Sequence, residues 1–300
     1  MWFKNIRPYR LSERLGINAE ELEQRLKSCP FTPCRPAQPK STGWVGALGD
    51  EASALVHAAG PFWMVRLKQE EKLLPSTVVR EEVANRVAQI QAAEGRKVYR
   101  KERLGIQDEV TQDFLPRAFS RSSSIEALIN EREGWIWVNT ASATRAEDLL
   151  ALLREAIGGL PVALPTTHKS PARVMSEWIL HRDLPEGLQA GFDADLAEPT
   201  EDGGVVRVRG VDLETDEVRS HIESGKLVER LALSWDVRLD FVLGQDLVWR
   251  RLKFSDALRE ANDELKDDEL ARRDADFLLM SEALMELTPL LLSAFGGLEQ

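Results

Sequence analysis

The sequence predicts an α+β fold of mixed antiparallel sheets with helices, and two observations predict it. Between residues 231 and 243 every odd position is apolar, which is typical of an antiparallel strand or hairpin with one buried face. Between residues 75 and 115 the apolar positions recur every three or four residues instead, as in helices. Strand-like segments lie on both sides of this stretch, so it forms a helical excursion from a strand-rich chain.

Composition and length limit the class of protein. The 300 residues suit one large domain or two to three smaller ones, and 43% apolar content is enough for packed cores and excludes a disordered chain. The only cysteines are Cys29 and Cys34, with no histidine cluster beside them. They provide neither a zinc site nor a disulfide framework, and they suit a reducing cytosol.

No segment has the pattern of a targeting or membrane-spanning sequence. The N-terminal residues lack the long apolar region and small-residue cleavage site of a signal peptide. The most apolar stretch, 277–298, is interrupted by Glu282, Glu286 and Pro289, which favours a packed C-terminal helix over a membrane span. We therefore expect a soluble cytoplasmic protein with no membrane partner.

Local sequence patterns predict the elements of the first 68 residues. Residues 1–11 are expected to form a strand, and Asn18 with Glu21 forms a capping box at the start of a short helix. Residues 29–43 are rich in proline, serine and glycine and are expected to be loop, whereas 62–68 alternates loosely and predicts a strand.

The helical excursion starts at Pro75-Ser76 and is interrupted at Gly95. Its apolar positions form a narrow stripe: Val79, Val83, Val87, Ile90, Ile106, Val110 and Phe114. A stripe this narrow is expected to be buried either against itself, as a helical hairpin, or against a partner copy.

A strand followed by a helix is expected over 134–160. Residues 135–138 are compact and apolar, Thr144 and Glu147 form a second capping box, and Gly158-Gly159 ends the helix.

After the alternating segment at 231–243, the turn at 244–246 leads into a partner strand at 247–254. Ser255 or Asp256 then caps a charged helix, and residues 263–276 are expected to form a solvated acidic face.

Motifs of common catalytic and cofactor sites are absent from the sequence. His221-Ile222-Glu223 resembles a zinc-deaminase motif, but no cysteine pair follows it. There is no phosphate-cradling glycine loop, nucleophile elbow or evident catalytic triad. Asp193 and Asp195 leave a metal site open as an alternative, although acids at this density are usually solvated. We expect no enzyme activity, no catalytic or metal-binding residue and no cofactor.

A basic run interrupts this acidic chain. Residues 96–103 hold five bases and one acid, a net charge of +4 in a chain of net charge −11. A dense basic patch on an acidic protein favours an anionic partner at one place, most often a phosphate backbone. The alternative is a solvated helix face.

Sequence motifs along the whole chain carry a resemblance. They are MWFKN (1–5), FTPC (31–34), EEKLLPS (70–76), LPRAFSR (115–121), AEDLLALLR (146–154), EDGGV (201–205), HIESGK (221–226) and DADF (274–277). In this order they resemble the RdgC family of proteobacterial recombination-associated proteins. Each motif alone is weakly specific, but together they are highly specific.

The resemblance implies a horseshoe-shaped subunit that forms a ring homodimer around a positively charged hole. The hole would admit double-stranded DNA, and also single strands, largely independently of sequence. The family restrains recombination by the recombinase RecA and is associated with the nucleoid. The alternative is a protein-interaction inhibitor that acts directly on the recombinase, with DNA binding incidental.

The same resemblance divides the chain. Residues 1–74 and 116–170 would form a central α+β region and 75–115 a helical tip. Residues 171–300 would form an α+β base that carries a finger loop near 203–212.

Candidate DNA contacts follow from charge and from the resemblance. The first group is the basic run: Arg96, Lys97, Arg100, Lys101 and Arg103. The finger loop adds Arg207 and Arg209, and Arg117 and Arg121 are further candidates that are alternatively paired with acids of the fold. Tyr99, within the run, is expected to pack rather than stack on a base.

Two further expectations concern single positions. Phe119 stands where the family has an aromatic residue at a dimer contact, and the alternative is an ordinary core phenylalanine. The family pattern has consecutive lysines and a glutamine where this chain has Arg209-Gly210-Val211, so Gly210 and Val211 supply no phosphate contact.

Overall fold

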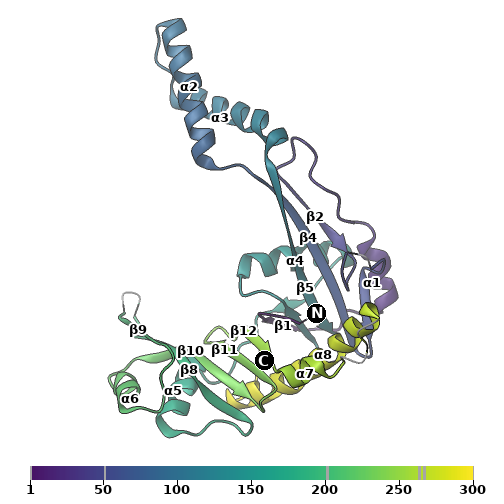
Figure 1. Ribbon diagram of the computed structural model, residues 1–300, viewed down its shortest axis with the longest axis vertical. Helices are drawn as coiled ribbons and strands as arrows, with labels where there is room; N and C mark the ends of the chain where they lie inside the picture. Colours follow the sequence, from purple (N-terminus) through teal and green to yellow (C-terminus); the bar gives the residue numbers. More distant parts are fainter. Residues whose placement is uncertain (1, 51, 201–202, 263–264, 266–267, 300) are drawn as a thin grey trace.

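The computed structural model describes residues 2–50, 52–200, 203–262, 265 and 268–299. The subunit is elongated and curved, with two helices at one end and a sheet at the other (Figure 1). The expected α+β class with antiparallel sheets is confirmed, since every ladder between the described strands is antiparallel.

The first sheet has seven strands in the order β2-β4-β5-β6-β1-β7, with β3 paired to β4 beside β2. Its strands are β1 (Arg7–Leu11), β2 (Lys40–Val45), β3 (Val56–Ala59), β4 (Phe62–Leu73), β5 (Phe119–Asn130), β6 (Trp135–Val138) and β7 (Val162–Ala163). Strands β4 and β5 pair over twelve residues each, from Phe62–Asn130 to Leu73–Phe119. This long ribbon carries the chain out to the helical end (Figure 1).

The second sheet has five strands in the order β12-β11-β10-β8-β9. They are β8 (Leu188–Ala197), β9 (Val205–Val208), β10 (Leu227–Trp235), β11 (Leu239–Gly244) and β12 (Trp249–Phe254). The two sheets are joined by reciprocal backbone hydrogen bonds of 2.7 and 2.9 Å between Ile6 and Trp249.

The helices complete the layers. They are α1 (Ala19–Leu26), α2 (Ser76–Glu94), α3 (Arg100–Phe114), the 3₁₀ turn η1 (Leu115–Arg117), α4 (Ala143–Ile157), α5 (Pro171–His181), α6 (Asp216–Glu223), α7 (Asp256–Glu260) and α8 (Glu269–Ala294). Side chains of β4 alternate between two cores, because successive residues of a strand point to opposite faces. Val65 and Leu67 pack with α1 and α4, whereas Phe62 and Met64 pack with α8.

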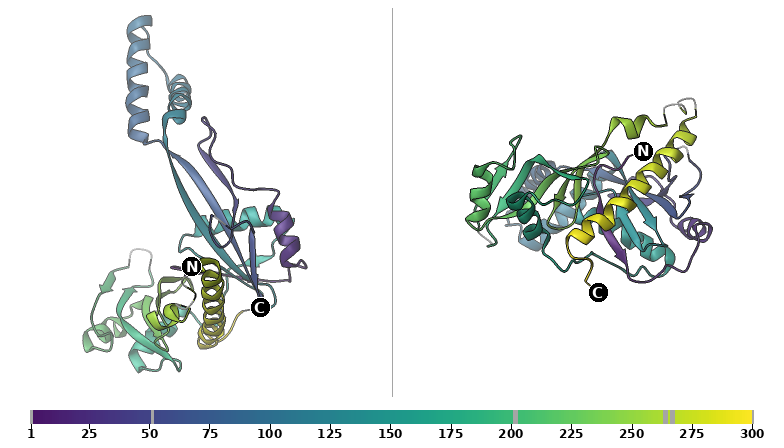
Figure 2. Two further views of the ribbon diagram at one scale, coloured as in Figure 1. Left: turned by 45° about the vertical axis from the view of Figure 1, so that its right-hand side comes forward. Right: turned by 90° about the horizontal axis from the view of Figure 1, so that it is seen from below.

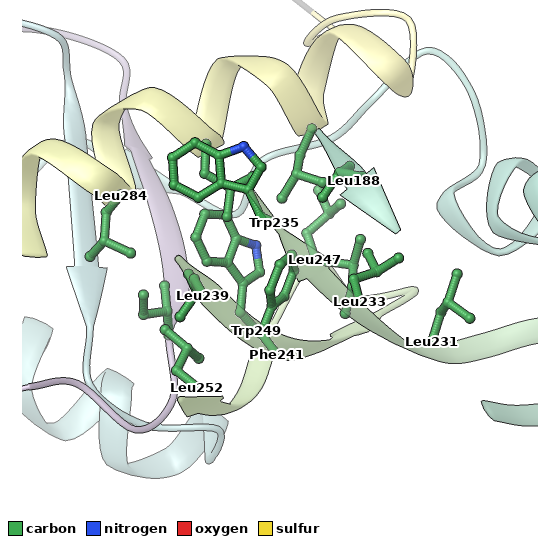
Figure 3. Close-up of a cluster of buried hydrophobic side chains, with 14 of the residues drawn as sticks. Leu188, Leu231, Leu233, Trp235, Leu239, Phe241, Leu247, Trp249, Leu252 and Leu284 are labelled. Carbon is green, nitrogen blue, oxygen red and sulfur yellow. The ribbon is translucent and has the colours of Figure 1, made fainter. Parts of the chain in front are cut away.

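The second sheet has one buried face, as its alternation predicts. Figure 3 shows Leu231, Leu233 and Trp235 of β10 with Leu239 and Phe241 of β11 in one buried cluster beside α8. The C-terminal helix is therefore a core element. By length and composition α8 is the one helix among the described residues that could cross a membrane, and 44% of that stretch is buried inside the fold.

Of the two alternatives for 231–243, a strand or a hairpin, the hairpin is the one observed, but the position of its turn was not predicted. Asp236 and Val237 both have positive φ, 47° and 56°, and the Arg238 N–H donates to the Trp235 carbonyl at 2.8 Å. These are the features of a type I′ turn. Val237 was counted as a buried position but is 83% exposed, because it lies in this turn.

The predicted Asn18–Glu21 capping box is confirmed, and the predicted Thr144–Glu147 capping box is wrong. Asn18 accepts from the Glu21 N–H and Glu21 from the Asn18 N–H, as predicted. Helix α4 instead begins one residue earlier than Thr144, and its cap is Ser142, which accepts from the Arg145 N–H.

Residues 40–43 were expected to be loop but form the start of β2, because they pair with β4; the other boundaries were close to their predictions. The first strand begins at Arg7 rather than residue 1, β6 and the Gly158 cap are as expected, and Ser255 caps α7. Part of the acidic face expected over 263–276 lies outside the described residues.

The stripe of the helical end is buried within the subunit. Val79 and Val83 of α2 pack against Ile106 and Val110 of α3 in a core of their own. Gly95 ends α2 with φ 65°, a left-handed conformation that glycine adopts without steric cost. Of the two alternatives for this stripe, burial against itself is the one observed.

Candidate nucleic-acid interface

The basic run lies at the far end of the α2–α3 hairpin. Residues 96–99 form the connection between the helices, and α3 begins at Arg100. Lys97, Arg100 and Lys101 are exposed, and none of them has an ion pair in the described structure. Arg103, one turn further, is exposed in the same way. These cations crowd the N-terminal end of a helix, where the macrodipole already favours an anion.

Arg96 differs from the other bases of the run. Its guanidinium donates to both carboxylate oxygens of Glu102, at 2.7 and 2.6 Å, and to Glu94 at 2.6 Å. These hydrogen bonds raise the pKa of Arg96 and lower that of Glu102. Arg96 therefore braces the turn, and its charge is largely neutralised.

Tyr99 does not pack within the subunit. Its side chain is 74% exposed at the start of α3, so the expected packing role is wrong for the isolated subunit. An exposed aromatic ring between Lys97 and Arg100 is free to contact a partner.

Arg117 and Arg121 lie where the hairpin meets the β4–β5 ribbon. Arg117 is on η1 and Arg121 is on β5, both exposed. The alternative pairing with acids is not found: Arg121 stands opposite Glu71 in the ladder, but neither arginine forms an ion pair among the described residues.

Phe119 is not a core phenylalanine. It is the first residue of β5, 84% exposed, and it stands opposite Leu73, which is 45% exposed. Together they leave an apolar pair uncovered at the base of the hairpin.

The expected finger loop is partly a strand. Val205–Val208 pairs with β8, and the chain is then tied back to β8. The Gly210 N–H donates to Asp193 at 3.0 Å and the Val211 N–H to the Phe192 carbonyl at 3.1 Å. Residues 201–202, which precede the expected loop, lie outside the described residues.

The β9 strand places arginines on a common face of the second sheet. Arg207 on β9 and Arg230 on β10 are both direct partners of Asp195 on β8. Directly paired residues point to the same face, so the three side chains lie in one row across the strands. Arg207 is exposed and has no ion pair in the described structure.

This row borders a shallow cavity of about 90 Å³ on the exposed side of the sheet. Four arginines line it, Arg209, Arg230, Arg250 and Arg251, together with Asp193 and Asp195. With Arg207, and with Asp246 as the partner of Arg250, five positive charges stand against three negative ones, which leaves a net charge of +2. We call these four arginines and Arg207 the basic sheet face.

Aspartates hold the arginines of this face in position. Asp195 accepts from Arg209 at 2.5 Å and from Arg230 at 3.4 Å, and Asp193 accepts from Arg251 at 3.1 Å. The Gly210 N–H and then Arg251 lower the pKa of Asp193, which therefore stays charged. A guanidinium has five N–H donors, so each arginine keeps donors for a further acceptor.

Arg250 is fixed by a bidentate pair of 2.9 and 2.6 Å to Asp246. Burial is the largest single influence on the pKa of Asp246 and would raise it, but the hydrogen bonds and charge of Arg250, the Val248 N–H and the charge of Arg7 together lower this pKa.

The basic sheet face is turned toward the side where the helical end lies. The other face of this sheet packs on α5 and α8. In Figure 1 α5 and the C-terminal end of α8 lie at the lower side of the second sheet, whereas the β4–β5 ribbon and α2–α3 rise above it. Figure 2 agrees, since α5 and α8 are in front when the molecule is seen from below.

Of the predicted contacts, the structure groups Arg207 and Arg209 on this face and the basic run at the opposite end. Sequence reasoning missed Arg230, Arg250 and Arg251. Their signal was present: they are the polar positions between the buried residues of β10 and β12.

Comparison with known proteins shows the family to which the chain belongs. The RdgC family model, whose description is "Putative exonuclease, RdgC", matches residues 1–298. The chain belongs to the RdgC family. The family resemblance of its motifs is therefore confirmed.

Relatives of the RdgC family match over full length. A protein of Aeromonas hydrophila is 43% identical over all of this chain and 99% of its own length. Proteins of Yersinia enterocolitica and Proteus mirabilis are 41% and 40% identical over 99% of this chain, and over 98% and 99% of their own lengths. All three are named "Recombination-associated protein RdgC".

The two family descriptions differ on catalysis. One names a nuclease, whereas the relatives are named for recombination. Among the described residues, no group of three or more histidine, cysteine or acidic side chains is placed to hold a metal ion.

Proposed function

We propose that this protein binds double-stranded DNA without sequence specificity and thereby restrains recombination by RecA. The observation that carries the proposal is the basic sheet face: a net positive, outward-facing row of arginines in a chain of net charge −11. Guanidinium groups bind phosphate in bidentate geometry. Phosphate contacts give affinity without reading bases. The acidic remainder disfavours DNA on other surfaces.

The experiment is a salt titration of binding to random-sequence duplexes, followed by fluorescence anisotropy. About six to ten phosphate contacts lower affinity by about 10³–10⁵ between 50 and 200 mM salt. Two duplexes of unrelated sequence should give the same affinity. A flat salt response, or a large preference for one sequence, would refute the proposal.

We further propose that two subunits close into a ring around the duplex. The curvature of the subunit (Figure 1) and the exposed cations at both of its ends support this arrangement. The exposed Phe119–Leu73 pair is an apolar contact surface suited to one junction. The regions 1–74 with 116–170, 75–115 and 171–300 would act as the body, tip and base of such a ring. Association with the nucleoid follows from the DNA binding.

The second candidate is inhibition by direct contact with the recombinase. Its distinguishing test is charge reversal of Arg207, Arg230 and Arg251 in a strand-exchange assay. The DNA-binding account predicts that inhibition is lost together with DNA affinity. Inhibition that survives the loss of DNA binding supports direct contact instead.

We propose a non-catalytic role despite the nuclease description of the family. The test is incubation with end-labelled linear DNA and Mg²⁺ or Mn²⁺. We expect intact DNA after an hour at saturating protein. Shortened products that disappear in EDTA would show a nuclease.

A further inference from the structure

A groove runs along the exposed side of α5, on the opposite face of the second sheet from its arginines. Two adjoining depressions, of about 480 and 400 Å³, share Lys169, Val174 and Glu177 in their walls. At 1.5 Å per residue, the eleven residues of α5 span about 16 Å. This is the length of about five residues of extended chain.

One end of the groove is basic. His168, Lys169 and Arg173 line it, and Glu177 is the one acid in its wall. Within the described parts of the chain, neither Lys169 nor Arg173 forms an ion pair, and both are exposed. This end therefore has unsatisfied positive charge.

The other end has an apolar floor that is already formed. Trp178 is 5% exposed and stacks on Phe295, with ring centroids 5.5 Å apart and an angle of 27° between the planes. Leu184, Pro185 and Ala294 complete this end, and Asp183 stands at its edge.

We propose that this groove binds an acidic peptide segment of a partner protein. Charge complementarity selects the occupant: its acidic residues lie beside Lys169 and Arg173, and an apolar residue about three positions away lies on Trp178. The reverse placement would bring acids against Asp183, which costs free energy. A preformed apolar site with a polar rim is the common design of peptide-binding sites.

The position of the groove separates it from the proposed DNA interface. Val174 and Trp178 belong to the core that α5 shares with the buried face of the second sheet. A peptide on α5 and a duplex on the basic sheet face would therefore be separated by the helix and the sheet (Figure 2). Both partners can be bound at once, and the inference does not rest on DNA binding.

The test is binding of fluorescein-labelled, amidated hexapeptides to the full-length protein, measured by anisotropy. The probe is Glu-Asp-Glu-Ser-Leu-Phe, together with its reversed sequence. Matched controls replace the acids with lysine or the Leu-Phe pair with Ser-Ser. We expect micromolar binding of one chain direction and at least tenfold weaker binding of both controls. Equal binding of all peptides, or none at 1 mM, would overturn the proposal.

Variants of the protein locate the site. Lys169→Glu with Arg173→Glu should weaken peptide binding at least tenfold while the affinity for a duplex changes less than threefold. Arg35→Glu with Arg154→Glu makes the same charge change at exposed positions elsewhere and should leave peptide binding within threefold. Equal loss in both pairs would show general charge attraction and refute the groove.

Ala294→Phe fills the apolar end without changing charge and should also weaken peptide binding at least tenfold. Circular dichroism melting checks that each variant is folded. If the unmodified protein binds the peptide but does not bind a duplex, the DNA-binding proposal alone is refuted.

Discussion

Arg96 and Glu102 form a bidentate ion pair, with two Nη–Oε hydrogen bonds of 2.7 and 2.6 Å. The residue that opens the basic run is thus engaged in closing the turn between α2 and α3. The other four bases of the run carry its available charge. The number of charged residues in a segment therefore does not show how many of them are available to bind a ligand.

This pairing predicts different effects within one octapeptide. Lys97→Glu with Lys101→Glu should weaken binding to a duplex at least tenfold at 150 mM salt, because two available cations are reversed. Arg96→Ala with Glu102→Ala removes a neutral pair and should change affinity less than threefold. The measurement is anisotropy with the same duplex for both variants. Equal losses would contradict the assignment of the ion pair.

The basic sheet face makes a second prediction. Arg230→Ala with Arg251→Ala should weaken duplex binding about tenfold. The slope of log affinity against log salt concentration should become shallower by about two, because about two fewer counterions are released on binding. Arg35→Ala with Arg154→Ala is the matched control, since it removes two exposed arginines away from this face. If the Arg230→Ala, Arg251→Ala protein binds the duplex with unchanged affinity, the second sheet is not part of the DNA interface.

Phe119 tests the proposed junction at the helical end. Phe119→Ser should shift the protein toward monomer at micromolar concentration, because an apolar ring that is 84% exposed in the subunit would be buried only in a dimer. Leu164→Ser, at another exposed apolar position, should leave the mass unchanged. Sedimentation equilibrium gives both masses. A Phe119→Ser protein with the mass of the parent would exclude Phe119 from the junction.

Local patterns predicted much of the fold because they act over a few residues. The Asn18–Glu21 capping box, the stripe from Val79 to Val110 and the alternation after Leu231 each follow from local periodicity or chemistry. The alternation did not reveal the position of the hairpin turn. The connection 236–238 is three residues long, so the buried residues of both strands fall at odd positions and the pattern continues across the turn.

The candidate site was less predictable for a different reason. Arg207 and Arg230 come together because β9 and β10 both pair with β8, which joins residues that are distant in sequence. Pairing between charges is equally non-local, as the Arg209–Asp195 pair illustrates. A sequence gives the number of charges but not which of them neutralise one another.

The turn itself gives a stability prediction. Val237→Gly should stabilise the fold by about 1 kcal/mol, because a β-branched residue at φ 56° is strained and glycine is not. Val206→Gly, inside the β8–β9 ladder, should instead destabilise it. Urea unfolding measures both changes. A loss of stability in Val237→Gly would mean that contacts of the valine outweigh its backbone strain.

The central claim is that two subunits enclose a duplex, and the topology of the DNA tests it most directly. Dimers whose two junctions have been covalently cross-linked in advance are mixed with linear duplex and with covalently closed circles of the same sequence. The account predicts that they bind the linear DNA by threading over its ends and do not bind the circles. Equal binding to both forms would contradict the ring and indicate an open cleft or surface binding.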